Sequence, residues 1–170
     1  MLLLRSDSVA TTHAIAGALA RLARVGDVIV LAGEMGAGKT AFAQGFGRAL
    51  GVTEPITSPT FTLVHSYRGD GKLTLHHADL YRLDRTEEVT DLALAELAEF
   101  GGIVLVEWGD VVAAALGDHL EVRLEFLEDL LDGTGEDAGG DTGRAIEISA
   151  TGPSWAARWD RVLRAMESFR

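Results

Sequence analysis

A glycine-rich segment near the start of the chain constrains its fold more than any other feature. Its residues, Gly33-Glu34-Met35-Gly36-Ala37-Gly38-Lys39-Thr40, satisfy the pattern G-x-x-x-x-G-K-[ST]. Residues 28–32 before it are a short apolar run typical of a buried parallel strand, and residues 39–50 after it predict a helix. Glycines let the backbone curl so that successive N–H groups point inward, and the start of the helix adds positive charge. Strand, loop and helix in this order predict a phosphate-binding loop.

The last two residues of the loop, Lys39 and Thr40, have the side chains that a bound nucleoside triphosphate requires. The lysine ammonium is placed to reach the β- and γ-phosphates, and the threonine hydroxyl is placed to ligate Mg²⁺. The chain has 15 basic residues, but only Lys39 and Lys72 are lysines. A lysine therefore stands at the position where a compact ammonium fits the loop and a planar guanidinium does not.

The remaining segments alternate between helical and strand patterns, which predicts the α/β class. We expect a P-loop NTPase-type three-layer domain whose mixed sheet has a parallel core plus antiparallel hairpin strands. The whole chain, 1–170, is expected to be one domain, with a mobile acidic and glycine-rich loop at 128–143. The patterns predict helices at 8–22, 86–100, 111–116 and from 153 onward, a hairpin of 61–67 with 73–77, and strands at 103–106, 120–126 and 145–150.

The composition excludes several classes of function. The chain has no cysteine, so disulfides, thiolate metal sites and cysteine nucleophiles are excluded. Its net charge of −11 disfavours direct binding of a nucleic acid, which depends on Lys and Arg neutralising phosphates. No apolar stretch approaches the roughly 20 residues that span a bilayer, and the leucines at 2–4 are too few for a signal-peptide core. We therefore expect a cytoplasmic protein without a membrane segment.

Two acidic residues are candidates for completing a nucleotide site. Glu107 ends the apolar run 103–106, which resembles a Walker B strand, and Asp79 ends the second arm of the hairpin. Ligands of open α/β sheets bind at the carboxyl ends of the strands, so both acids are predicted to lie near the loop. The segment Ser58-Pro59-Thr60 is either a switch loop that senses the γ-phosphate or an ordinary turn into a strand.

The histidines and tryptophans carry weaker signals. His76 and His77 are adjacent on a predicted strand and must point to opposite faces, so one is expected to be packed and the other exposed. With His65 they invite a metal site, but no further ligand has suitable spacing, and we do not predict one. We expect Trp108 and Trp155 to be core or groove aromatics.

Four sequence blocks in this order resemble the TsaE family, the bacterial ATPases of tRNA threonylcarbamoyladenosine biosynthesis. The resemblance extends from about Thr12 to the final strand. The blocks are the glycine-rich loop itself, Ile56-Thr57-Ser58-Pro59-Thr60-Phe61-Thr62-Leu63-Val64, His77-Ala78-Asp79-Leu80-Tyr81-Arg82-Leu83 and Leu105-Val106-Glu107-Trp108.

The resemblance implies a Mg²⁺-dependent P-loop ATPase, slow alone and dependent on partners. It implies Lys39 and Thr40 at the phosphates and Mg²⁺, Glu107 as the metal acid and Asp79 as a second essential acid. The residues that it places at the nucleotide are the loop 33–40 with Thr12, Thr60 and Arg144. Family members act with TsaB and TsaD, which implies that tRNA is reached only indirectly, through that complex. The loop at 128–143 is longer than the usual connection in the family, which bears on how this chain docks its partners.

Three other functions compete with this one. A P-loop GTPase usually carries an Asn-Lys-x-Asp motif, and this chain contains no asparagine. A small P-loop kinase generally closes an arginine-bearing lid over its substrates, and the long loop here is acidic. A nucleotide-dependent interaction module with negligible turnover of its own remains compatible with the sequence.

Overall fold

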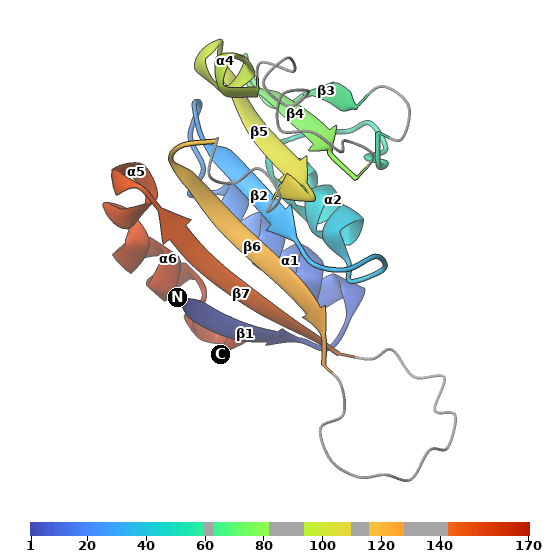
Figure 1. The fold of residues 1–170 in the computed structure, drawn as a ribbon, viewed down its shortest axis with the longest axis vertical. Helices are drawn as coiled ribbons and strands as arrows, with labels where there is room; N and C mark the ends of the chain where they lie inside the picture. The colour runs from blue at the N-terminus through green and yellow to red at the C-terminus, as the bar shows by residue number, and fades with distance from the viewer. Residues whose placement is uncertain (60–62, 82–93, 110–115, 128–142) are drawn as a thin grey trace, which may run out of the picture.

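The computed structural model describes residues 1–59, 63–81, 94–109, 116–127 and 143–170. These residues form a seven-stranded sheet in the order β1-β7-β6-β2-β5-β4-β3 (Figure 1). The strands are β1 (Leu2–Ser6), β2 (Val28–Ala32), β3 (Val64–Arg68), β4 (Thr74–Asp79), β5 (Gly102–Glu107), β6 (His119–Phe126) and β7 (Arg144–Thr151).

The sheet is parallel in the middle and antiparallel at both edges. β6, β2, β5 and β4 pair in parallel, and β3 joins β4 as an antiparallel hairpin. At the other edge β7 pairs antiparallel with both β6 and β1. The predicted α/β class with a mixed sheet is confirmed, and so is the predicted hairpin of β3 with β4.

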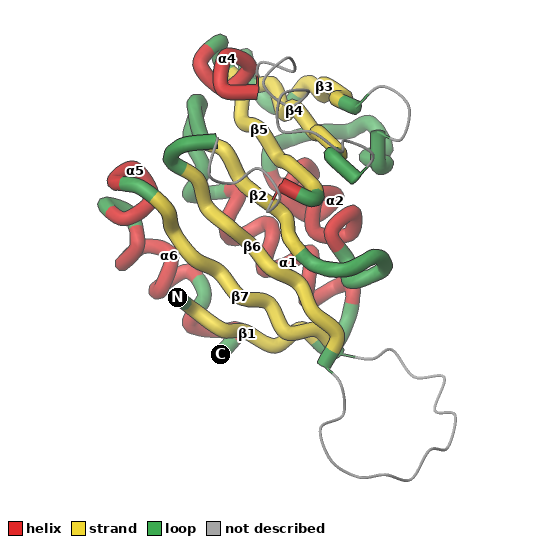
Figure 2. Tube along the Cα trace, viewed as in Figure 1, coloured by secondary structure: helices red, strands yellow, loops and turns green. Residues whose placement is uncertain are grey.

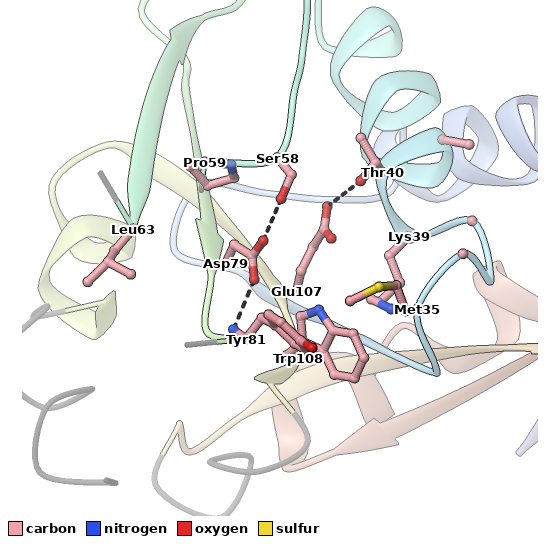
Figure 3. A pocket seen from close by; sticks show the side chains of 13 residues that line it. Met35, Lys39, Thr40, Ser58, Pro59, Leu63, Asp79, Tyr81, Glu107 and Trp108 are labelled. Carbon is pink, nitrogen blue, oxygen red and sulfur yellow. Dashed lines mark hydrogen bonds between the residues drawn. The ribbon is translucent and has the colours of Figure 1, made fainter. Parts of the chain in front are cut away.

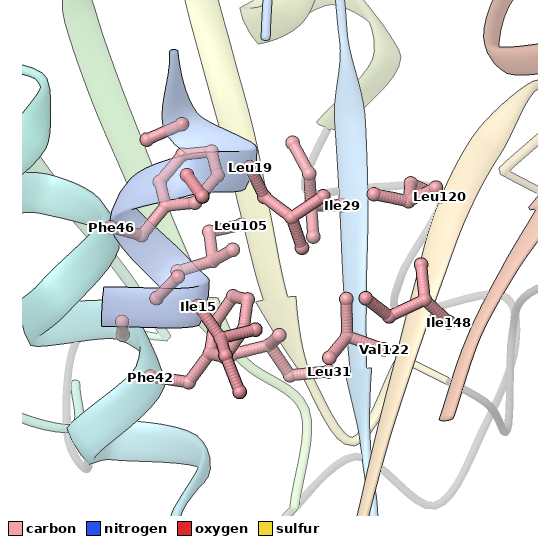
Figure 4. Close-up of a cluster of buried hydrophobic side chains, with 14 of the residues drawn as sticks. Ile15, Leu19, Ile29, Leu31, Phe42, Phe46, Leu105, Leu120, Val122 and Ile148 are labelled. Carbon is pink, nitrogen blue, oxygen red and sulfur yellow. The ribbon is translucent and has the colours of Figure 1, made fainter. Parts of the chain in front are cut away.

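Helices α1 (Val9–Ala20) and α2 (Lys39–Ala49) pack side by side against one face of the sheet (Figure 2). The side chain of Ser8 caps α1 by accepting a hydrogen bond from the amide of Thr11 at 3.1 Å. Gly45 lets the two helices approach closely, because a Cβ there would lie 2.6 Å from the Cα of His13. Figure 4 shows the resulting core between helices and strands, formed by Ile15, Leu19, Phe42 and Phe46 against Ile29, Leu31, Leu105, Leu120, Val122 and Ile148.

On the opposite face of the sheet, α4 (Leu94–Glu99) packs against β5. Its buried residues Leu94 and Ala98 belong to a second apolar cluster with strand residues Val28, Val30, Ala78, Val104 and Val106 and with Leu80. Buried residues therefore lie on both faces of β2 and β5, as expected for central parallel strands. Among the described helices, none is long and apolar enough to cross a membrane.

The C-terminal helix predicted from residue 153 is divided in the structure. It consists of α5 (Pro153–Ala156), α6 (Trp159–Ala165) and the short 3-10 helix η3 (Glu167–Phe169). The division occurs at Arg158. The backbone amide of Arg158 donates to Trp155 O, and the side-chain Nε of the same residue donates to Ser154 O at 3.2 Å. The side chain thus occupies the carbonyl that a continuous α-helix would offer to that amide.

Strand β1 was not predicted from the sequence. Its residues alternate between buried and exposed, and Leu2 pairs with Ile148 of β7 far along the chain. The predicted helix at 111–116, the first part of that at 86–100 and the loop at 128–143 fall mainly on residues 82–93, 110–115 and 128–142. Those residues lie outside the described ranges.

The strand register brings the two candidate acids to one edge of the sheet. Leu31 of β2 pairs with Glu107 of β5, and Glu107 pairs with Asp79 of β4. These three parallel strands end together where the glycine-rich loop begins.

Candidate functional site

The glycine-rich loop connects β2 directly to α2. Gly33 has a φ of 125°, and a Cβ at this position would lie 2.0 Å from Leu124 O of the neighbouring strand. Any other residue here would have to adopt a rare backbone conformation, and the neighbouring strand would have to move to make room for its Cβ. Helix α2 begins at Lys39, directly after the loop, so its N-terminal amides face the space that the loop surrounds.

The ammonium of Lys39 is held by its own loop. Its Nζ donates hydrogen bonds of 2.7 Å to the carbonyl oxygens of both Gly33 and Glu34. It also lies 3.9 Å from the centroid of the Trp108 ring, which is a cation–π contact. Lys39 is buried, and the positive charge is therefore fixed at the base of the loop.

The Glu107 carboxylate joins the loop helix to the sheet. Its Oε1 accepts a hydrogen bond from the Thr40 hydroxyl at 3.2 Å, and it also lies 2.9 Å from Nε2 of His77. Both Glu107 and His77 are buried. The predicted pair of Mg²⁺ ligands, Thr40 and Glu107, is thus in direct contact at the start of α2.

Asp79 is held differently from Glu107. Its Oδ2 accepts a short hydrogen bond from the Ser58 hydroxyl, and its Oδ1 accepts one from the Tyr81 amide at 2.9 Å. Its own amide donates to Leu63 O at 2.9 Å. Asp79 therefore ties the segment at Ser58 to the end of β4. Thr60, the other hydroxyl predicted in that segment, lies outside the described residues.

These groups surround one cavity of about 370 Å³ (Figure 3). The rings of Tyr81 and Trp108 lie 5.0 Å apart at its edge, and Met35 and Tyr81 are 64% and 54% exposed. Leu63 and Trp108 have positive φ angles of 59° and 61°, and no other described residue besides glycine does. The cavity is lined by Met35, Gly36, Gly38, Lys39, Thr40, Ala41, Ser58, Pro59, Leu63, Asp79, Tyr81, Glu107 and Trp108.

Thr12 and Arg144 line a separate, small cavity of about 40 Å³ together with the loop residues Ala37 and Gly38. Arg144 Nε donates to Ala37 O at 3.2 Å, and its guanidinium lies 4.3 Å from the Phe126 ring centroid. The Thr12 hydroxyl is 2.8 Å from Ser6 Oγ and is buried. Both residues contact or adjoin the loop, but neither lines the larger cavity.

The structure thus brings most of the predicted site residues together. Met35, Gly36, Gly38, Lys39, Thr40, Asp79 and Glu107 line the larger cavity. The carbonyls of Gly33 and Glu34 hold the Lys39 ammonium, and Ala37 lines the smaller cavity beside Arg144.

Sequence reasoning did not identify His77 as a partner of Glu107. The spacing offered a signal, since His77 lies two residues before Asp79 on one strand, and alternate residues share a face. Trp108, expected only as a core or groove aromatic, lies against Lys39 and lines the cavity.

The donor set at the loop fits a magnesium nucleotide. Mg²⁺ is usually held by one or two protein oxygens together with phosphate oxygens and water, so Thr40 and Glu107 suffice on the protein side. The described residues contain no group of three or more His, Cys, Asp or Glu side chains that could hold a metal by themselves. Thr40 and Glu107 would leave the other Mg²⁺ positions to phosphate oxygens and water.

Comparison with known proteins gives consistent matches. The family model described as "Threonylcarbamoyl adenosine biosynthesis protein TsaE" matches residues 6–130. Two relatives are both named tRNA threonylcarbamoyladenosine biosynthesis protein TsaE. The one from Bacillus subtilis is 45% identical over 62% of this chain and 65% of its own length. The one from Streptomyces coelicolor is 38% identical over 81% of this chain and 89% of its own length. The aligned part therefore spans slightly less than two thirds of the Bacillus relative.

A solved structure matches nearly the whole chain. The crystal structure of Bacillus subtilis YdiB superposes with a TM-score of 0.73 and 32% sequence identity, covering 96% of this chain and 94% of that one. The family model alone covers well over half of the 170 residues, and it includes the loop, both candidate acids and the strands that carry them. The chain belongs to the TsaE family.

Proposed function

We propose that this protein is the ATP-binding and ATP-hydrolysing component of tRNA threonylcarbamoyladenosine biosynthesis, and that it supports turnover of a TsaB–TsaD complex. The observation that carries the proposal is the contact between Thr40 and Glu107 at the start of α2, beside the Lys39 ammonium. A hydroxyl, a carboxylate and a buried lysine around a glycine-rich loop are the groups that hold a magnesium nucleotide in P-loop enzymes.

Each of these groups has a separate task. Lys39 exchanges its contacts with Gly33 O and Glu34 O for the β- and γ-phosphates, and the amides at the start of α2 hold the same oxygens. Thr40 and Glu107 provide the protein oxygens for Mg²⁺. A bound Mg²⁺ would supply positive charge beside the phosphate oxygens.

Asp79 and Ser58 are suited to orienting the attacking water. Asp79 accepts the hydrogen bond that the Ser58 hydroxyl donates. The lone pairs of the Ser58 oxygen are therefore available to accept a hydrogen bond from a water in the cavity, which Ser58 lines. Water forms a bond to the γ-phosphorus while the bond to the bridging oxygen breaks. The products are ADP and dihydrogen phosphate, whose two protons come from the attacking water.

The edge of the cavity supports a role for protein partners. Met35 and Tyr81 expose apolar surface beside the nucleotide site, where a bound protein would exclude water. The net charge of −11 argues against direct contact with tRNA, so tRNA is reached through the complex.

Phosphate release from ATP by the purified protein, alone and with TsaB–TsaD, tests the proposal. Wild type should release phosphate, faster with the partners, and Lys39→Ala and Glu107→Ala should not. Equal release by all three proteins would contradict the assignment. Tight nucleotide binding without release above background would instead support an interaction module, and ADP formed together with a phosphorylated acceptor would support a kinase.

A further inference from the structure

His77 lies beneath the nucleotide site rather than in it. It is on β4, where it pairs with His65 of β3 and Leu105 of β5, and it is completely buried. It does not line the cavity, yet its Nε2 is 2.9 Å from Glu107 Oε1. Its other ring nitrogen, Nδ1, is buried and has no hydrogen-bond partner among the described residues.

The two ring nitrogens therefore have different roles. Glu107 is an acceptor, so Nε2 must carry a proton and donate it. Nδ1 is buried and makes no hydrogen bond to the described residues, so it does not orient the ring. The geometry places a proton on Nε2, the nitrogen that faces Glu107.

We propose that His77 is a positioning residue for Glu107, and that it sets how strongly Mg²⁺ contributes to nucleotide binding. The inference rests on the proposed function. Glu107 is only 3% exposed, and its Oε1 accepts from Thr40 as well as from His77. When Thr40 turns its oxygen toward a metal, His77 remains as the fixed donor that holds the carboxylate in place. Partners of metal ligands commonly have this role, and losing one typically weakens metal binding by about 10- to 100-fold.

Two substitutions separate the two ring nitrogens. The amide nitrogen of glutamine lies about as far along the side chain as Nε2, whereas that of asparagine is attached where Nδ1 is. His77→Gln can therefore still donate to Glu107, and His77→Asn cannot. Both introduce a neutral amide at the same buried position, so they differ mainly in the reach of the donor.

The adjacent histidine provides a matched control. His76 is on the same strand but faces the other way, is partly exposed and lies 2.8 Å from Ser66 Oγ through its Nδ1. It has no contact with the nucleotide cavity. His76→Gln therefore makes the same chemical change one residue away from the proposed position.

The experiment is calorimetric titration of each protein with ADP, in Mg²⁺ and in EDTA. The readout is the ratio of the two affinities. His77→Asn should lower this ratio about tenfold or more while leaving the affinity in EDTA within about twofold, because it acts on the metal ligand alone. His77→Gln should restore most of the ratio, and His76→Gln should match wild type.

Several outcomes would overturn the inference. An unchanged ratio in His77→Asn, or equal losses in the Gln and Asn variants, would show that the donor at Nε2 is not what matters. Loss of affinity in EDTA as well would show a merely structural role. If wild type bound no nucleotide at all, the proposed function itself would fail, which is a distinct result.

A second measurement needs no variant. Long-range proton–nitrogen spectra of wild-type protein should show His77 with a proton on Nε2. A proton on Nδ1 alone would contradict the hydrogen bond to Glu107 and overturn the inference even if His77→Asn failed to fold.

Discussion

Asp79 and Glu107 lie opposite each other in the parallel pairing of β4 with β5, but their carboxylates have separate partners. Asp79 accepts from the Ser58 hydroxyl and the Tyr81 amide, whereas Glu107 accepts from Thr40 and His77. One acid is therefore connected to the segment that contains Ser58, and the other to the helix that follows the glycine-rich loop. The two acids should differ in what their removal does.

Replacing Asp79 should affect turnover more than binding. Asp79→Asn keeps the size of the side chain but makes it a weaker hydrogen-bond acceptor for the Ser58 hydroxyl. We therefore expect the rate of phosphate release to fall about a hundredfold. ATP affinity should change by less than about threefold, since Asp79 does not touch the phosphates in the proposed arrangement. Steady-state kinetics and calorimetry measure the two effects, with the exposed Asp160→Asn as control. A variant that lost affinity and kept its maximal rate would refute this role.

Replacing Lys39 should affect binding itself. Hydrogen bonds to a charged group contribute about 1.5–3 kcal/mol, so Lys39→Ala should weaken ATP binding by about 10- to 100-fold. Lys72, the other lysine, is exposed near the turn between β3 and β4, and Lys72→Ala is the matched control. Calorimetric titration of both variants with ATP and Mg²⁺ gives the comparison. Equal ATP affinities for Lys39→Ala and Lys72→Ala would show that Lys39 does not contribute to ATP binding.

The ion pair between Asp27 and Arg158 should contribute to stability and not to activity. Arg158 donates from Nη1 to Oδ2 of Asp27 at 2.8 Å and from Nη2 to Oδ1 at 2.6 Å, and both residues are buried. Removing one partner of a buried pair leaves a charge without compensation, so Asp27→Ala should lower the free energy of unfolding by about 3–5 kcal/mol. Urea denaturation measures this change.

The exposed Arg161→Ala provides the control for that experiment, and its effect should stay within about 0.5 kcal/mol. Nucleotide affinity of folded Asp27→Ala should equal that of wild type, because the pair does not line the nucleotide cavity. A loss of stability below about 1 kcal/mol would show that the pair is dispensable.

Two histidines should make the protein less stable in mild acid. Burial lowers the pKa of His76, and burial together with the nearby positive charge of Arg48 lowers the pKa of His13. Because the folded state then binds these protons less readily than the unfolded state, stability should fall as the pH drops through the ordinary histidine pKa of 6.5.

Urea midpoints of wild type and of the double variant His13→Gln, His76→Gln between pH 8 and pH 5 test this prediction. The variant should lose less stability than wild type on acidification, and the comparison at pH 8 isolates any effect of the substitutions on packing. Parallel pH profiles for the two proteins would rule out a contribution from these histidines.

Local patterns predicted the parts of the fold that depend on local sequence. The apolar run 28–32, the loop and the helix after it form as expected, because strand, glycines and helix follow one another along the chain. Strand β1 was missed because its partner, β7, lies far away in the sequence. The division at Arg158 was missed because it depends on that side chain reaching Ser154, Leu22 and Asp27.

In the candidate site, too, local patterns did not predict the contacts between residues that lie far apart in the sequence. Alternation along β4 predicted that one of two adjacent histidines is packed and the other exposed; His77 is buried, whereas His76 is only partly exposed. The position of Glu107 beside His77 depends on the pairing with β5, which local patterns do not give. Thr12 and Arg144, which the family resemblance places at the nucleotide, lie at the smaller cavity by Ala37. Their contact with a nucleotide stays a prediction.

The contacts of Lys39 have a consequence for which anions the loop can bind. Two carbonyl oxygens and the Trp108 ring already hold its ammonium, so an incoming anion competes with the protein's own groups. The observed affinity is then the difference between two sets of favourable contacts. A singly charged ion gains little from such an exchange, whereas a chain of phosphates offers several charged oxygens at once. We therefore expect the loop to favour polyphosphates over singly charged anions.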